Sequence, residues 1–203
     1  MNSPLTVNKL CFSYSPIMKS LIVPLAAFLA SPALADSPSP PPEKLTVCSP
    51  ARKLCAISDP GKNVTLVSSQ VNGQAPWTIP GWHRWLFPSD DGESVVVGHD
   101  GMNLVPVDVT LSEPVLFFYN QGRLVRTIKL GQLYGHKQQL QRTASHFAWV
   151  RNIGFKSPNQ FVVELVNGKE VAFAPETGVS EQVGADPNPS NNIPINRNVG
   201  IHF

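Results

Sequence analysis

The sequence carries little charge and has no run of basic residues. Only 15% of the residues are charged, with 16 Lys and Arg against 14 Asp and Glu. Lys9 and Lys19 belong to the first 35 residues, so the chain without that part has 14 basic and 14 acidic residues. A neutral domain without a basic run lacks the electrostatic footprint of a nucleic-acid-binding protein, and its neutrality argues against binding to anionic membranes. We therefore expect no nucleic acid among its partners.

Hydrophobic runs are scarce too, and the one that stands out is Leu21–Ala30 near the N-terminus. It is short for a membrane span, Pro24 interrupts it, and an Ala-Leu-Ala pattern ending at Ala35 follows it. These features are typical of a signal peptide with a small-residue cleavage site. We expect residues 1–35 to be cleaved, which leaves no stable membrane anchor, and Met18 fits as a start of translation as well as Met1 does. A retained N-terminal anchor is the alternative.

Cysteine is rare as well, with three in the chain. Cys11 leaves with the predicted leader, so Cys48 and Cys55 remain as a pair in an oxidising compartment. Such a pair favours a disulfide over a redox or metal site, which needs closer spacing or more ligands. The intervening residues can turn the chain back. The bridge would then join two strands of a hairpin and add about 2–3 kcal/mol of stability.

Proline and glycine, in contrast, are plentiful, with 20 and 14 residues, and no long helical pattern accompanies them. Residues 36–44 read as a proline-rich linker, residues 45–183 as one β-rich domain and residues 184–203 as a disordered tail. Short apolar runs between turn residues predict an all-β, mainly antiparallel meander, with one short helical segment near 130–142. The expected strands are 45–48, 54–58, 65–68, 84–87, 94–98, 104–107, 115–120, 124–129, 147–153, 160–166 and 170–174.

A weak repeat runs through this pattern. Phe117–Leu130 and Val162–Gly178 both read as hairpins whose turn ends in glycine and whose second strand is apolar. Such hairpins resemble the blades of β-propellers, but the chain has room for at most three, and a closed ring normally needs at least four. An incomplete propeller and a β-sandwich are both open.

Four segments carry a resemblance to a family. Together the segments resemble a group of uncharacterised bacterial secreted or periplasmic proteins, and they cover most of the predicted domain. The resemblance implies a periplasmic or secreted bacterial setting, but no activity and no catalytic residue. The segments are Trp82–Gly98, Val115–Tyr134, Arg142–Val150 and Phe161–Gly178.

Catalytic and metal signatures are missing. The sequence has no G-x-S-x-G elbow and no H-E-x-x-H motif. Ser145 and His146 are adjacent in the sequence, and adjacent residues in an extended chain point to opposite faces, so we do not expect them to act as nucleophile and base. A polar loop held by hydrogen bonds is the plainer interpretation of this stretch. Asp residues before Gly are explained by turn chemistry. We predict no metal site and no cofactor, and keep a hydrolase built from His146, His99 and nearby acids as an alternative. Four histidines could meet at a metal in the fold, but their spacing matches no known ligand motif. They are His83, His99, His136 and His146.

Aromatic residues between strands give the strongest sign of binding. Tryptophans on a Pro/Gly-rich loop can present flat apolar surface to a partner, although they can equally fill the core. Arg84, Arg142 and Arg151 are expected to pack against aromatics or pair with acids. The first hypothesis is a non-catalytic binding protein whose partner is a protein or an envelope component, and a periplasmic inhibitor or immunity protein is a further alternative. The candidate binding residues are Trp82, His83, Trp85, His146 and Trp149.

Overall fold

The computed structural model describes residues 40–70 and 74–181. The predicted leader, residues 36–39 of the linker and the predicted tail lie outside this part. The described residues are mostly β-strand, and every strand pairing is antiparallel, which confirms the predicted fold class. The strands are β1 (Leu45–Cys48), β2 (Leu54–Asp59), β3 (Val64–Ser69), β4 (Trp77–Pro80), β5 (Leu86–Pro88), β6 (Ser94–Gly98), β7 (Leu104–Pro106), β8 (Pro114–Asn120), β9 (Arg123–Lys129), β10 (Gln141–Arg142), β11 (His146–Ala148), β12 (Val150–Ser157), β13 (Gln160–Leu165), β14 (Glu170–Ala174) and β15 (Val179–Glu181).

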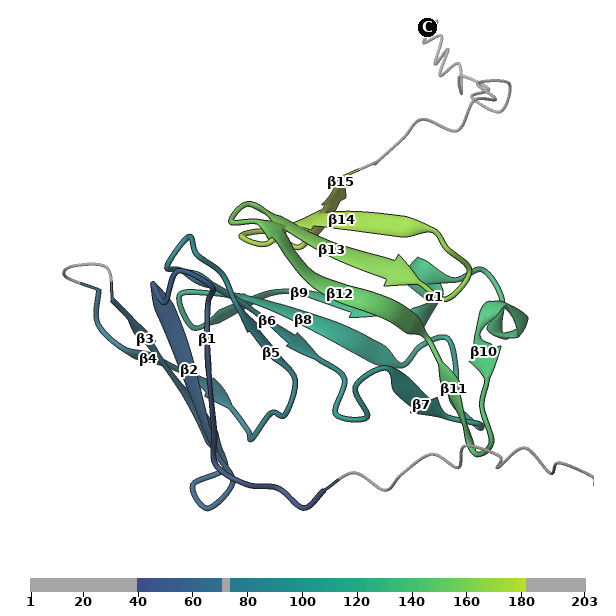
Figure 1. Cartoon of the computed structure of the whole chain (residues 1–203), viewed down its shortest axis with the longest axis horizontal. Helices are drawn as coiled ribbons and strands as arrows, with labels where there is room; N and C mark the ends of the chain where they lie inside the picture. The colour runs from purple at the N-terminus through teal and green to yellow at the C-terminus, as the bar shows by residue number, and fades with distance from the viewer. Residues whose placement is uncertain (1–39, 71–73, 182–203) are drawn as a thin grey trace, which may run out of the picture. The chain divides into compact units, whose positions relative to one another are not determined.

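Three four-stranded sheets and one three-stranded sheet make up this region (Figure 1). The four-stranded sheets have the orders β1-β2-β3-β4, β5-β6-β8-β9 and β12-β13-β14-β15, and the smaller sheet has the order β10-β11-β7. In each four-stranded sheet the strands lie in their order along the chain, although β7, which belongs to the smaller sheet, comes between β6 and β8. In the turn between β8 and β9, Gln121 and Gly122 both have positive φ, 48° and 82°, as a two-residue hairpin loop requires.

The middle sheet is covered on both faces. Val95 and Val97 of β6 pack against the β1–β4 sheet, while Val96 packs into the cluster that includes the β12–β15 sheet. Phe117 and Phe118 of β8 divide between the two faces in the same way. Successive residues of a strand point to opposite faces, so a strand that is apolar throughout belongs between two layers. The described residues therefore stack three sheets.

Cys48 and Cys55 stand directly opposite each other in the β1–β2 ladder and form a disulfide. This confirms both the predicted bond and the predicted hairpin. Ser49, at the turn, accepts hydrogen bonds through its Oγ from Lys53 N at 3.1 Å and Leu54 N at 3.3 Å. The hairpin end is therefore closed by a covalent bond and by local side-chain bonds.

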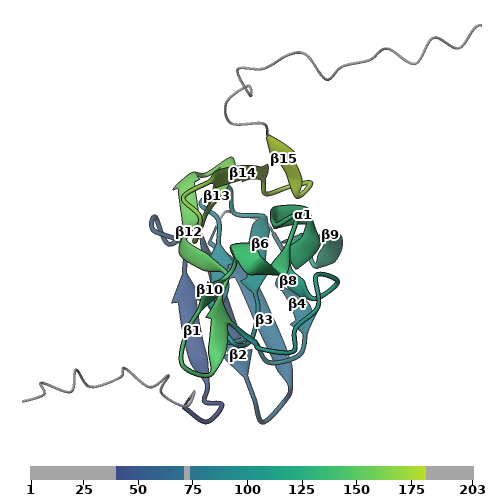
Figure 2. The same ribbon diagram turned by 90° about the vertical axis from the view of Figure 1, so that its right-hand side faces the viewer.

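The predicted helical segment holds two short pieces, helix α1 (Leu130–Leu133), which follows β9 directly (Figure 2), and a 3₁₀ turn, η1 (Lys137–Gln139). Leu130 and Leu133 are buried. Between the two pieces, Tyr134 is buried and its hydroxyl donates to Trp149 O and accepts from Val166 N at 3.2 Å. These bonds tie the segment to the last sheet.

The strand predictions differ from the structure in four places. The single strand expected over 147–153 is split into β11 and β12 at Trp149. The ring of Trp149 is buried, and its backbone N–H donates to Asn103 O at 3.0 Å. Three strands were not predicted. Edge strand β4 ends in Pro80, which an edge tolerates, and β10 and β15 are too short to show a period.

Candidate functional site

The predicted tryptophan cluster is divided between the core and the surface. Trp85 packs against Phe87 and Trp149, with ring centroids 5.4 and 6.1 Å apart. A Cβ on Gly98 would lie 2.4 Å from Trp85 Cε3, so glycine lets the ring lie flat on β6. Trp85 is therefore a packing residue. Trp82, in the same loop between β4 and β5, is half-buried and belongs to neither core cluster of the described residues.

Hydrogen bonds fix this loop at both ends. Gly81 N bonds Asn63 O and Trp82 N bonds Asn63 Oδ1, each at 3.1 Å. His83 N donates to Ser58 Oγ at 2.7 Å, and the His83 Nε2 atom lies 2.9 Å from Pro80 O. Ser58 is itself fully buried. The backbone of residues 81–83 is thus held by Ser58 of β2 and by Asn63, which directly precedes β3.

Trp82 and Arg84 face the proline-rich segment that precedes β1. Trp82 Nε1 donates to Glu43 O at 2.9 Å, and Arg84 donates from its guanidinium to Pro40 O. The guanidinium carbon of Arg84 lies 5.3 Å from the centroid of the Trp82 ring. Composition predicts an extended linker here but does not reveal that the folded part holds it.

The two other predicted binding residues are elsewhere. His146 lies in β11, paired with Pro106 of β7. Trp149 is fully buried, and its Nε1 donates to Met102 O at 2.8 Å. Trp149 contacts the loop between β4 and β5 at Trp85, whose ring centroid lies 6.1 Å from its own, and it serves the core.

Ser145 and His146 do not point to opposite faces, contrary to the prediction. Ser145 lies in the bend before β11, outside the strand, and its Oγ lies 2.8 Å from His146 Nδ1. The rule of alternating faces holds only within a regular strand. A serine hydroxyl and an imidazole are therefore in contact on the surface.

The remaining histidines and acids are used locally. The His99 Nε2 atom lies 3.8 Å from Glu113 Oε1, and Asp91 Oδ1 accepts from Glu93 N and Ser94 N at 2.7 and 2.8 Å. The latter bonds are the predicted turn chemistry. Among the described residues there is no group of three or more His, Cys, Asp or Glu placed to hold a metal.

The arginines behave as predicted. Arg84 covers the Trp82 ring, and the Arg142 guanidinium carbon lies 5.2 Å from the Phe147 centroid. Arg151 Nη1 bonds Glu164 Oε1 at 3.0 Å. None of these side chains needs a ligand to explain its position.

Two tyrosines show shifted pKa values. Burial raises the pKa of Tyr134, and the hydrogen bond from the Val166 backbone partly opposes this rise. Burial also raises the pKa of Tyr119, whose side chain packs between the first two sheets. Both shifts favour the neutral phenol and follow from packing.

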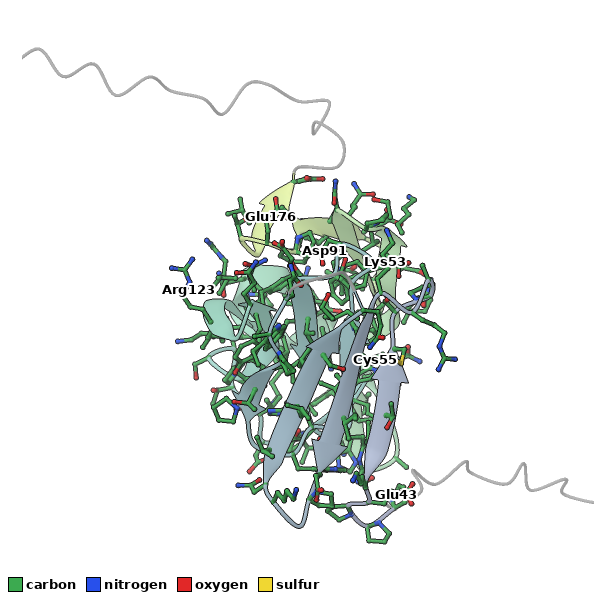
Figure 3. All side chains as sticks on the ribbon, turned by 90° about the vertical axis from the view of Figure 1, so that its left-hand side faces the viewer. Glu43, Lys53, Cys55, Asp91, Arg123 and Glu176 are labelled. Atoms are coloured by element: carbon green, nitrogen blue, oxygen red, sulfur yellow. A yellow bond between two sulfur atoms is a disulfide. The ribbon has the colours of Figure 1, made fainter. Side chains whose placement is uncertain are left out.

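One surface was not predicted: the face of the β1–β4 sheet that points away from the middle sheet, called here the outer β1–β4 face (Figure 3). Its central row is Thr46, Ile57, Leu66 and Thr78, paired in register across all four strands. Leu66 is 40% exposed. The flanking positions are Asp59, Val64, Pro80, Ser68 and the disulfide.

Among the strand residues of the outer β1–β4 face Asp59 is the charged one, and its Oδ2 lies 3.7 Å from the Nζ of Lys44, which directly precedes β1. A sheet face in water normally alternates its core residues with polar ones. The sequence does contain a signal for this exception, since Ile57 and Leu66 stand at the positions that alternate with the core residues Ala56 and Val67.

The corresponding face of the β12–β15 sheet has the opposite character. It carries two ion pairs, Arg151 with Glu164 at 3.0 Å and Lys156 with Glu170 at 3.4 Å. A shallow hollow of about 360 Å³ lies there, around Gly154. Because its carboxylates are paired with cations, this face is an ordinary solvated surface.

No helix among the described residues is long and apolar enough to cross a membrane. Comparison of the chain with protein-family models, with curated proteins and with solved structures found no match. The resemblance to exported bacterial proteins therefore stays a prediction.

Proposed function

We propose that this protein is an exported, non-catalytic binding module that uses the outer β1–β4 face to contact a partner protein of the bacterial envelope. The central row of that face, which carries no charged side chain, is the observation that supports the proposal. Apolar side chains in a contiguous patch on a soluble surface mark interaction sites. The face is a flat sheet, which suits a protein surface better than a small ligand, since small ligands bind in concave pockets.

The size of the face limits how strong this contact can be. The four strands have 4, 6, 6 and 4 residues. At about 3.4 Å per residue and about 4.8 Å between strands, they present on the order of 300 Å². A stable interface of standard size needs about 800 Å² from each partner. The proposed complex is therefore either transient or extended over neighbouring surface. A dimer formed through this face alone would bury less than the area of about 800 Å² per partner that a stable interface needs.

Affinity capture from envelope extract tests the proposal. The wild-type protein is compared with Leu66→Lys, which places a charge at the centre of the face, and with Leu124→Lys as a matched control. Leu66 and Leu124 are 40% and 46% exposed on different strands, so both changes are surface changes. We expect one protein to be retained by wild type and Leu124→Lys and lost by Leu66→Lys. Equal retention by both variants would contradict the use of this face.

An inhibitor or immunity protein would be one form of this same function, in which the captured partner is an enzyme. Inhibition of the captured enzyme by the wild type, but not by Leu66→Lys, would identify that form.

A second candidate, an exported hydrolase, is favoured by one contact. Ser145 Oγ and His146 Nδ1 are 2.8 Å apart, and a serine paired with an imidazole is a possible nucleophile and base. Labelling with a serine-reactive fluorophosphonate decides the matter. A hydrolase predicts a label that Ser145→Ala removes, whereas the binding module predicts no label at Ser145.

A further inference from the structure

The loop between β4 and β5 presents two hydrogen-bond donors to one short segment. Trp82 Nε1 donates to Glu43 O at 2.9 Å, and the Arg84 guanidinium donates to Pro40 O. The two accepting carbonyls are three residues apart in the sequence. A polyproline II helix repeats every three residues, so these carbonyls point to the same side of such a helix.

The chemistry of the segment matches that of the loop. The residues Pro40, Pro41 and Pro42 have no backbone N–H, so their backbone offers only acceptors. A site complementary to such a segment has to supply donors and a flat apolar surface. Trp82 and Arg84 supply both, and aromatic surfaces of this kind are a general mode of proline-rich recognition.

The backbone of the loop is held by hydrogen bonds that do not involve the proline-rich segment. Asn63 accepts hydrogen bonds from Gly81 N and Trp82 N through two atoms, its backbone O and its Oδ1, and Ser58 Oγ accepts one from His83 N. The Arg84 guanidinium lies over the Trp82 ring, 5.3 Å from its centroid, which orients both donors together. Little conformational entropy is then lost on binding.

We propose that Trp82 and Arg84, called here the Trp82–Arg84 clasp, form a binding site for a proline-rich segment in the polyproline II conformation. The occupant is the chain's own segment before β1, whose Pro40 and Glu43 carbonyls accept hydrogen bonds from the clasp. The site does not rest on the outer β1–β4 face, because its residues belong to a different loop, and either proposal can fail without the other.

The test compares the purified protein with a variant in which Pro40, Pro41 and Pro42 are replaced by glycine. The readout is the indole N–H signal of Trp82 in a ¹H–¹⁵N spectrum, assigned with Trp82→Phe. The probe is a synthetic peptide with the sequence of residues 36–44. A second peptide, with glycine in place of the same three prolines, is the control. The indole N–H of Trp149, which bonds Met102 O in the core, reports folding in every sample.

The proposal predicts that the glycine variant moves the Trp82 signal and that the proline peptide restores it in a saturable manner. Wild type should need at least about tenfold more peptide, because its tethered segment competes at high effective concentration. Arg84→Ala in the glycine variant should weaken peptide binding, and Arg126→Ala, an exposed arginine of β9, should not. An unchanged Trp82 signal in the glycine variant, or equal effects of the two peptides, would overturn the proposal.

Discussion

Tyr134 shows how a single side chain joins separate parts of the chain. Its hydroxyl contacts Trp149 O and Val166 N, so it links the helical segment to the beginning of β12 and the end of β13. Burial holds its pKa above the ordinary value of 10.0. The sequence could not reveal this role, since a tyrosine after a weak helix has no pattern that names its distant partners.

The raised pKa of Tyr134 makes stability depend on pH at the alkaline end. Below pH 10.0 the phenol is neutral in both the folded and the unfolded chain. As the pH rises further, the unfolded chain releases the proton while the folded chain retains it, so the free energy of unfolding falls. The contribution is lost as the pH passes through the raised pKa.

We predict that Tyr134→Phe is less stable than wild type by about 1–3 kcal/mol near neutral pH, because Trp149 O and Val166 N lose their partner. The variant should also lose less stability than wild type between about pH 9 and about pH 11. Urea unfolding at the two pH values measures both effects. Parallel pH profiles for the two proteins would show that Tyr134 does not titrate as described. Tyr119→Phe is a second variant for the same comparison of stability at two pH values, since burial raises the pKa of Tyr119 as well.

Among the elements, the β1–β2 hairpin was predicted in full from its sequence. Two cysteines around a turn-forming stretch define both strands and the bond between them, and the structure pairs Cys48 with Cys55 directly. The bond closes a short loop, with a sequence separation of 7. It also lies at one end of the outer β1–β4 face.

We predict that Cys48→Ser/Cys55→Ser lowers the free energy of unfolding by about 2–3 kcal/mol, because the unfolded chain regains the entropy of the closed loop. The fold should persist, since the hairpin retains its ladder and the Ser49 bonds. Denaturant unfolding of wild type, with and without reductant, and of the double variant provides the measurement. A double variant as stable as oxidised wild type would contradict the estimate.

Other elements escaped prediction for physical reasons. Strand β4 has only four residues and ends in Pro80, so its sequence resembles that of a loop. Strands β11 and β12 read as one strand because Trp149 is apolar like its neighbours, yet its ring needs the core and its Nε1 needs Met102 O. Local patterns do not show where a strand must break to bury one large side chain.

At the scale of the whole molecule, the described residues stack three antiparallel sheets. Strand β6 reads as apolar throughout, and both its faces are indeed covered. Comparison with propeller blades stays a prediction, because the stack alone fits an incomplete propeller and a layered sandwich equally.

The stack also explains why the candidate site was only partly predictable. Trp82, His83 and Trp85 stand out as a cluster, but which of them reach the surface depends on how β4 leads into β5. Ile57 and Leu66 look like ordinary strand residues until the opposite face is known to pack on β6. The residues that form the exposed face of a sheet can be identified only when the residues that pack on its inner face are known.

The most direct test of the central claim is photo-crosslinking in cells that export the protein. A photoreactive phenylalanine derivative is placed at Leu66 on the outer β1–β4 face, and in a separate strain at Leu124 on β9, where exposure is similar. The account predicts a discrete crosslinked partner from position 66 and none from position 124. A partner captured from position 124 alone, or no adduct at position 66 in folded and exported protein, would contradict it.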